Sequence, residues 1–240
     1  MIDLHSHYLP DVDDGAPTME ASLDMLRTAA ADGITHMVAT PHQRHPAGYD
    51  VSAELARERL AAVKAAAAEA GVPVELSLSA EIHYSEGIPE GLADGTLLPL
   101  GEGSRYFLFE LPVTTVPGNL REMIFAFQTA GCYPVLAHPE RNFEVMEKPK
   151  KAALLREQGV LLQITAQSIT GEFGRKSRAA AKKLLKWGVA DVIASDAHNP
   201  DRRPPGLSEA VRRAAKWVGA ERAEAMVTEI PRRILAGKEV

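Results

Sequence analysis

Histidine and carboxylate residues recur in this chain at spacings that suit metal ligation. His5 and His7 form one such pair, and Asp196 and His198 repeat the spacing far along the chain. Residues two apart on an extended segment project to the same side, so each pair could hold one ion. The full set of candidate ligands is His5, His7, Asp14, His42, Glu81, Glu110, His138, Asp196 and His198.

Mixed imidazole and carboxylate ligands suit Mn, Fe and Zn about equally well. The candidates are too numerous for one ion, so the pattern predicts a cluster of two or three ions. Such a cluster favours hydrolysis, because it lowers the pKa of bound water and stabilises the attacking and leaving oxygens. Cys132, the single cysteine, does not begin the C-x5-R loop of cysteine-dependent phosphatases, since the sixth residue after it is His138. We therefore exclude Cys132 as a nucleophile.

Alternating apolar runs and amphipathic segments predict the elements that position these residues. The predicted strands are Met1–His5, Ile34–Thr40, Val74–Ala80, Tyr106–Leu111, Tyr133–Ala137, Val160–Thr165 and Ala190–Ala194. The predicted helices are Thr18–Asp32, Ser52–Ala70, Asn119–Ala130, Pro149–Gln158 and Gly174–Trp187, with a short helix between Ser85 and Ser104 and a helical tail from Leu207. Strands separated by helices indicate a parallel sheet, either a barrel of about seven βα units or an open doubly wound sheet. No GxGxxG motif or P-loop follows the first strand, which disfavours a nucleotide-binding Rossmann fold.

The candidate ligands lie where the predicted strands end. In a parallel barrel these ends converge on one face, where such enzymes build their active sites, so we expect one cleft. A single histidine at a strand end is more often structural, and the prediction rests on the repetition over several strands. His45 and His83 flank strong candidates and are weaker ones, whereas His36 lies inside a strand and is predicted to be structural.

Length and charge limit the possible functions. The 240 residues fit one α/β domain over 1–240. A net charge of -5 gives no electrostatic footprint for nucleic acid. No apolar run is long enough to span a membrane, the N-terminus does not resemble a signal peptide, and a lone cysteine suits a reducing compartment. A cytoplasmic location is therefore expected.

With these segments in view, the sequence resembles the PHP (polymerase and histidinol phosphatase) superfamily, in particular the bacterial tyrosine-protein phosphatases of capsular and exopolysaccharide loci. The resemblance runs over nearly the whole chain. The segments that carry it are Met1–His7, Asp11–Ala16, Ala80–Ile82, Ala137–Arg141, Ala194–Asn199 and Arg202–Pro205. The DVDDG loop and the SDAHN segment followed by RRPP are specific to this branch, whereas the first histidine pair alone is not.

This resemblance implies a distorted (βα)7 barrel with three divalent metal ions, usually manganese, with Fe or Zn as alternatives. It implies one ion held by His5, His7, Glu81 and Asp196, a second by Glu81, Glu110 and His138, and a third by Asp14, His42 and His198. Arg141 and Arg203 match the phosphate-binding arginines of the family. The implied substrate is a phosphotyrosine-containing protein, in particular a bacterial tyrosine autokinase that controls capsule or exopolysaccharide synthesis.

Two other functions remain open on the sequence alone. One is a small-molecule phosphatase such as histidinol-phosphatase, because one fold hosts many substrates. Pro41, Gln43 and His83 depart from the expected family pattern and bear on substrate preference. The other is a non-catalytic metal-binding module, which the completeness of the ligand set disfavours. Whether the chain forms a homo-oligomer is also left open.

Overall fold

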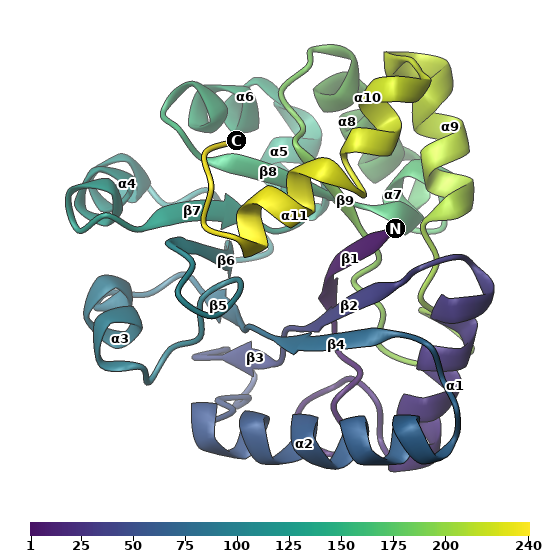
Figure 1. Ribbon diagram of the computed structural model, residues 1–240. Coiled ribbons are helices and arrows are strands. Elements are labelled where there is room, and N and C mark those ends of the chain that lie inside the picture. Colours follow the sequence, from purple (N-terminus) through teal and green to yellow (C-terminus); the bar gives the residue numbers. More distant parts are fainter.

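The computed structural model describes residues 1–240 as parallel strands enclosed by helices (Figure 1). The strands are β1 (Ile2–Ser6), β2 (His36–Ala39), β3 (His42–Gln43), β4 (Glu75–Leu78), β5 (Glu81–His83), β6 (Tyr106–Glu110), β7 (Tyr133–Leu136), β8 (Leu161–Thr165) and β9 (Val192–Ala194). The helices are α1 (Met19–Ala31), α2 (Ala53–Glu69), α3 (Ile88–Asp94), α4 (Leu120–Thr129), η1 (Pro139–Arg141), α5 (Phe143–Glu147), α6 (Lys150–Glu157), α7 (Ala166–Thr170), α8 (Gly174–Lys186), α9 (Ser208–Val218), α10 (Ala220–Ala225) and α11 (Glu229–Leu235).

Two short strands were not predicted. β3 follows the second predicted strand and β5 follows the third, each after a break, so the hydrogen-bonded order is β1-β2-β4 in one sheet and β3-β5-β6-β7-β8-β9 in the other. Pro41 lies in the first break and has no N–H to offer to a strand ladder. Glu81 therefore begins the short strand β5, whereas the sequence pattern placed it at the end of the third strand.

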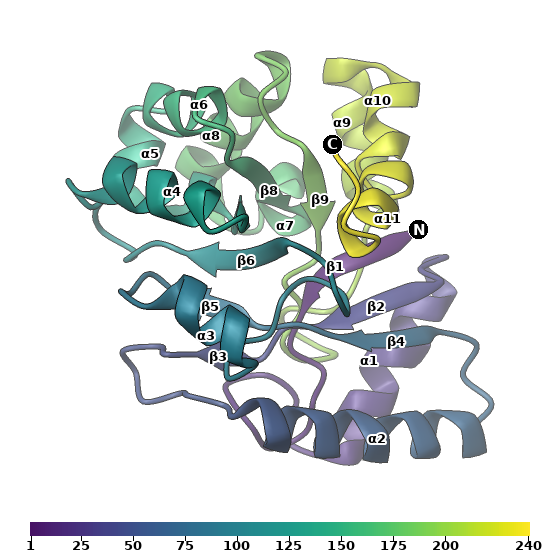
Figure 2. The ribbon, with the colours of Figure 1, turned by 60° about the vertical axis from the view of Figure 1, so that its left-hand side comes forward.

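Hydrogen bonds between the two ends of the strand order close the ring. The Asp196 N–H donates to the His5 carbonyl at 2.8 Å, and the His7 N–H donates to the Ala197 carbonyl at 2.8 Å. All strand pairs are parallel, and helices lie outside them (Figure 2). The predicted distorted α/β barrel is confirmed as the fold class, and the hydrogen bonds between β1 and the segment after β9 favour it over an open doubly wound sheet.

The longer helices begin and end close to the residues that the sequence predicted. Thr18 and Ser52 cap α1 and α2 through their side-chain oxygens, as N-cap residues do. The predicted tail forms three helices, of which α11 contacts β1 and the loop before β6 (Figure 1). The short helices α5 and α7 were not predicted, because five residues are too few to show helical periodicity.

The buried apolar side chains form one continuous cluster that extends from Ile2 to Ile234. Strands β6 to β9 contribute fully buried runs, as expected for parallel strands that are covered on both faces. The carboxyl ends of the strands are therefore held by a rigid scaffold. No helix is both long and apolar enough to cross a membrane.

Candidate metal centre

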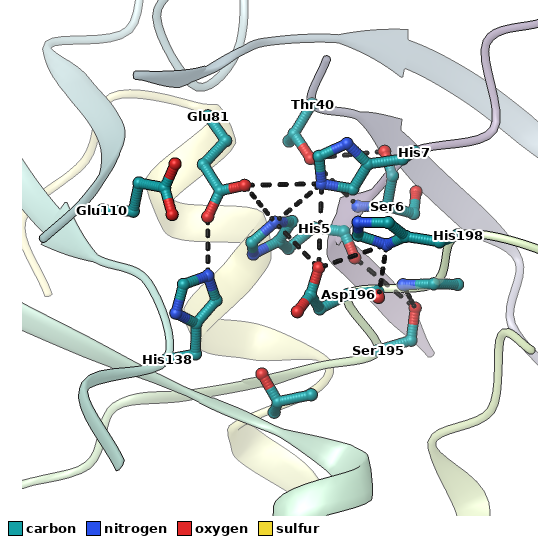
Figure 3. A network of polar contacts seen from close by, with 12 residues as sticks. His5, Ser6, His7, Thr40, Glu81, Glu110, His138, Ser195, Asp196 and His198 are labelled. Atoms are coloured by element: carbon teal, nitrogen blue, oxygen red, sulfur yellow. Dashed lines mark hydrogen bonds and ion pairs between the residues drawn. The ribbon is translucent and has the colours of Figure 1, made fainter. Parts of the chain in front are cut away.

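The structure brings the candidate ligands together at the carboxyl ends of the strands, where seven of them line one cleft and the buried His5 and His7 contact Glu81 and Asp196 of that cleft. Figure 3 shows His5 and His7 with Glu81, His138, Asp196 and His198. β1 supplies His5, and the loop after it supplies His7 and Asp14. The other ligands come from β3, β5, β6 and the segments after β7 and β9, and are His42, Glu81, Glu110, His138, Asp196 and His198. Residues that lie up to 193 positions apart in the sequence are thus neighbours.

The deepest group surrounds the two histidines of the first pair. His5 Nε2 and His7 Nε2 lie 3.2 Å apart, and both are fully buried. Glu81 Oε2 lies 3.3 Å from the first nitrogen and 3.4 Å from the second. Asp196 Oδ1 approaches the same nitrogens to 3.4 and 3.7 Å. Four ligand atoms therefore converge on one point (Figure 3).

Two further groups flank this one. On one side, His138 Nε2 lies 2.7 Å from Glu81 Oε1, and Glu110 completes a group whose ligand atoms all lie within 4.8 Å of one another. On the other side, Asp14 Oδ1 lies 3.3 Å from His42 Nε2 and 3.5 Å from His198 Nε2. The candidate ligands therefore form more than one group that could hold a metal ion.

The hydrogen bonds of the histidines show that this centre suits cations. His5 Nδ1 lies 3.0 Å from Gln163 Oε1, and His7 Nδ1 lies 2.9 Å from Asp13 Oδ2. Since amide and carboxylate oxygens can only accept, these bonds place a proton on each Nδ1 and leave a lone pair on each Nε2. Two facing lone pairs beside two carboxylates repel one another unless positive charge lies between them.

The pKa directions reflect the same excess of negative charge. Burial disfavours a charged ring at His7, but Asp13 and Glu81 nevertheless raise its pKa well above the ordinary value. Burial also opposes ionisation of Asp196, yet His5 and neighbouring guanidiniums hold the pKa of this carboxyl far below its usual range. One further nitrogen, His42 Nδ1, is buried without a hydrogen-bond partner.

Two of the candidate ligands have a strained backbone conformation. His138 has a φ of 32° and Asp196 a φ of 53°, in the left-handed region that non-glycine residues rarely adopt. Each follows a barrel strand at the point where the chain turns across the cleft. Strain of this kind persists where the surrounding structure enforces it, typically at functional sites.

Two arginines face the ligands across the cleft. Arg141 Nη1 contacts Asp196 Oδ2, and Arg203 Nη2 lies 2.6 Å from the same oxygen. The Phe173 ring lies beneath both guanidiniums, with its centroid 4.6 Å from Cζ of Arg141 and 5.6 Å from Cζ of Arg203. The two cations thus share one carboxylate oxygen and one aromatic face.

Comparison with known proteins shows to which family this chain belongs. The sequence profile described as "Capsular polysaccharide synthesis, CpsB/CapC" matches residues 1–236. The chain belongs to the CpsB/CapC family. This membership confirms the resemblance to bacterial tyrosine phosphatases of capsular loci.

Named relatives of this CpsB/CapC protein agree over nearly its whole length. Tyrosine-protein phosphatase YwqE of Bacillus subtilis is 34% identical over 227 residues, which is 92% of this chain and 86% of the relative. Tyrosine-protein phosphatase CpsB of Streptococcus pneumoniae is 30% identical over 240 residues, which is 98% of each chain.

Solved structures agree with this placement. A crystal structure from work on YwqE and CpsB as "unique metal-dependent tyrosine phosphatases" superposes with a TM-score of 0.94 at 33% identity, covering 100% of this chain and 96% of that one. A phosphotriesterase from Mycobacterium tuberculosis has a TM-score of 0.58 at 13% identity over 98% of this chain and 93% of that one, and shares the fold alone.

The site also contains residues that form hydrogen bonds with the candidate ligands or their neighbours and that the sequence analysis did not predict. Asp13 orients His7 and accepts from the His42 N–H at 3.1 Å, while Gln163 orients His5. Asp3 accepts from the N–H and the hydroxyl of Ser195, and burial raises the pKa of Asp3 to about 6. Asp13 stands in the DVDDG segment, which could have indicated it, but nothing in the sequence pointed to Asp3 or Gln163.

Of the three remaining histidines, two lie near a candidate ligand and one does not. His45 Nε2 lies 3.4 Å and His83 Nδ1 lies 3.3 Å from Glu110 Oε1, and of the two only His45 lines the cleft. His36 bonds to Ser77 Oγ at 2.7 Å and stays away from the ligands, as expected for a structural residue. Cys132 is a free cysteine in the turn before β7, outside the residues that line the cleft.

Gly15 allows the loop after β1 to approach the centre. A Cβ at this position would lie 2.1 Å from the His7 carbonyl oxygen and 2.6 Å from His7 Cβ. We expect Gly15→Ala to displace Asp13 and Asp14 and to lower kcat/KM by roughly a hundredfold, with loss of bound metal. Metal analysis of the purified variant checks this. Gly118→Ala, where a Cβ meets nothing within 4 Å, is the control, and full metal content in Gly15→Ala would contradict the expectation.

Proposed function

We propose that this protein hydrolyses phosphotyrosine in proteins with the help of bound divalent metal ions. One observation carries the proposal: a multinuclear set of histidine and carboxylate ligands faces two arginines across one cleft. The family match over residues 1–236 and the names of YwqE and CpsB support the choice of phosphotyrosine. We treat residues 1–240 as one phosphoesterase domain.

Three ions, which we propose to be manganese, fit the three groups of ligands. His5, His7, Glu81 and Asp196 would hold the first ion, Glu81, Glu110 and His138 the second, and Asp14, His42 and His198 the third. Glu81 would be shared, because its two oxygens face different groups. Iron and zinc suit the same ligands and remain alternatives.

The arginines have the chemistry to bind the phosphoryl group. A guanidinium offers planar paired donors that match phosphate oxygens, and Arg141 and Arg203 point into the cleft from opposite loops. In this proposal they hold the phosphoryl oxygens and stabilise the charge that develops on them. Bound metal ions would activate water and neutralise the oxygens in the manner of other multinuclear hydrolases.

The cleft also suits an aromatic leaving group. Val113, Phe143, Met146 and Phe173 line it beside the arginines, and Val113 and Phe143 remain 60% and 54% exposed. These apolar surfaces could pack against a tyrosyl ring. A phenolate has a free pKa of about 10, so it leaves with less protonation than an aliphatic alkoxide needs.

The biological partner follows from the family. We propose that the substrate is the phosphorylated form of a bacterial tyrosine autokinase that controls capsule or exopolysaccharide synthesis, and that the reaction takes place in the cytoplasm. The family description, which names capsular polysaccharide synthesis, supports this. A serine-phosphate or histidinol-phosphate substrate turned over as well as a phosphotyrosyl peptide would contradict it.

Metal removal tests the proposal directly. We expect a chelator to reduce phosphotyrosyl peptide hydrolysis by roughly a thousandfold or more, because no protein nucleophile replaces activated water. Adding Mn should restore activity, and the bound metal can be counted by mass spectrometry. Activity that survives complete metal removal would refute the mechanism, and metal binding without hydrolysis of any ester would point to a non-catalytic module.

Phe173 provides a second test, because its ring lies under both arginines. Cation–π contacts contribute about 0.5–2 kcal/mol, so we expect Phe173→Leu to lower kcat/KM by about tenfold with unchanged metal content. Phe173→Tyr keeps the aromatic face and should stay within about threefold of the unmodified protein. Phe125→Leu is the control, since Phe125 is exposed on α4 and does not line the cleft. Equal activity of Phe173→Leu and Phe173→Tyr would exclude the aromatic contact as the cause.

A further inference from the structure

Helix α8 has a charge opposite to that of the rest of the protein. Its thirteen residues, GRKSRAAAKKLLK, contain six cationic side chains and no carboxylate. Residues 148–186 as a whole contain ten Lys or Arg and two Asp or Glu, a net charge of +8. Because the whole chain has a net charge of -5, the remaining residues have a net charge of -13. Positive charge is therefore concentrated on one part of the surface.

This helix begins at the lip of the candidate cleft. Phe173, directly before α8, and Ser177, in its first turn, both line the cleft. The helix also contacts η1, which contains Arg141, and α5, and these elements lie on the same side of the molecule (Figure 2). Arg175 and Lys176 are exposed, and in the sequence they lie between these two cleft residues.

The cations of α8 form no ion pair within the protein, although one of them, Lys182, lies over the Trp217 ring. All six are exposed, and the surface ion pairs involve other cations, such as Arg27, Lys151 and Arg212.

A row of like charges on one helix destabilises the helix slightly. The helix dipole favours Lys183 and Lys186 in the last turn, so helix stability accounts for these two but not for Arg175 and Lys176 in the first turn. At the helix N-terminus the cost is larger, because the helix dipole disfavours cations there. An anionic partner outside the chain would offset both effects.

We propose that the amino-terminal end of α8, with Arg175 and Lys176, is a docking surface for acidic residues that flank the phosphotyrosine of a protein substrate. The inference rests on the proposed function and adds a preference in substrate sequence. A phosphotyrosyl side chain has a charge of about -1.5 to -2, and neighbouring carboxylates extend that charge along the peptide. When the phosphoryl group is bound in the cleft, the substrate residues on either side of the phosphotyrosine must lie at the edge of the cleft, near these cations.

The structure offers a matched pair of variants on the same helix. Arg175→Glu/Lys176→Glu reverses two charges at the amino-terminal end, and Lys183→Glu/Lys186→Glu makes the same change at the far end, about 10 Å or more away along the axis. Both lower the net charge by four. Acidic residues stabilise a helix N-terminus, so the first variant should fold at least as well as the unmodified protein.

The experiment compares two phosphotyrosyl peptides, one with acidic and one with neutral flanking residues, and p-nitrophenyl phosphate, using the Mn-loaded full chain. For the acidic peptide we expect Arg175→Glu/Lys176→Glu to lower kcat/KM by about tenfold or more at low salt, mainly through KM, and 0.5 M salt to reduce that difference. The neutral peptide and p-nitrophenyl phosphate should change by less than about threefold. The control variant should behave like the unmodified protein on all three.

Three results would overturn the docking surface. Equal losses in both variants would show an effect of global charge, and an equal loss on p-nitrophenyl phosphate would show that these residues serve the phosphoryl site. A change confined to binding of vesicles with anionic lipid would assign the helix to a membrane. In all three cases the unmodified protein would still hydrolyse phosphotyrosine, whereas absence of hydrolysis by that protein would refute the proposed function itself.

Discussion

Replacing Glu81 by Gln is expected to abolish nearly all activity. Glu81 is buried, and its two oxygens face His5, His7, His42 and His138 at 2.7 to 3.4 Å. An amide of the same shape has one oxygen and no charge, so it cannot serve two neighbouring ions. We expect kcat/KM for a phosphotyrosyl peptide to fall by roughly a thousandfold or more, together with loss of at least one bound ion per chain.

The measurements are steady-state kinetics and metal content for the same preparation. Glu75→Gln is the matched control, because Glu75 begins strand β4 but its side chain is 73% exposed and far from the ligands. Thermal unfolding of the metal-free proteins separates chemistry from folding. A Glu81→Gln protein that retains all its metal and more than a tenth of the activity would show that the carboxylate does not hold the centre together.

Replacing Arg141 by Lys is expected to have the second largest effect, even though the positive charge is kept. Arg141 contacts Asp196 and stacks on Phe173 at 4.6 Å, and only a planar guanidinium can do both while presenting paired donors to phosphate. We expect kcat/KM to fall by roughly a hundredfold with the metal content unchanged. Inhibition by inorganic phosphate should weaken in parallel.

Arg121→Lys is the control for this change, because Arg121 is exposed on α4 and outside the cleft. The split between metal content and activity is the informative readout. Arg141→Lys activity within about threefold of the unmodified protein would show that a point charge suffices and that bidentate binding is not needed. Loss of metal in Arg141→Lys would show that the arginine acts through Asp196 instead.

The sequence predicted which residues lie together at the cleft better than it predicted the details of the strands. His5, His138 and Asp196 could be placed together because parallel strands direct their carboxyl ends to one face. The interruption between β4 and β5 was not foreseen, since Ser79 and Ala80 give no sign of a break in an apolar run. Glu81 nevertheless falls in the cleft, because the break shifts the strand sideways without turning its end away.

The supporting residues were hidden for a different reason. Gln163 sits in an apolar strand and meets His5 across 158 positions of sequence, and local spacing contains no information on such a contact. In the sequence, Phe173 is an ordinary residue before a helix. Its contact with two guanidiniums arises only because the segments after β7 and β9 place Arg141 and Arg203 against its ring. Ligands at strand ends follow a rule of the fold, whereas the residues that orient them depend on tertiary packing.

The hydrogen bonds between β1 and the segment after β9 can form only after most of the chain has been synthesised. Asp3 and His5 leave the ribosome early, but their partners Ser195 and Asp196 follow about 190 positions later. At 5–20 residues per second the interval is roughly 10 to 40 s. Throughout that time the first histidines have no complete set of co-ligands, so a nascent or prematurely terminated chain cannot assemble the centre. Cells would thereby avoid releasing an active fragment before the entire ring has formed.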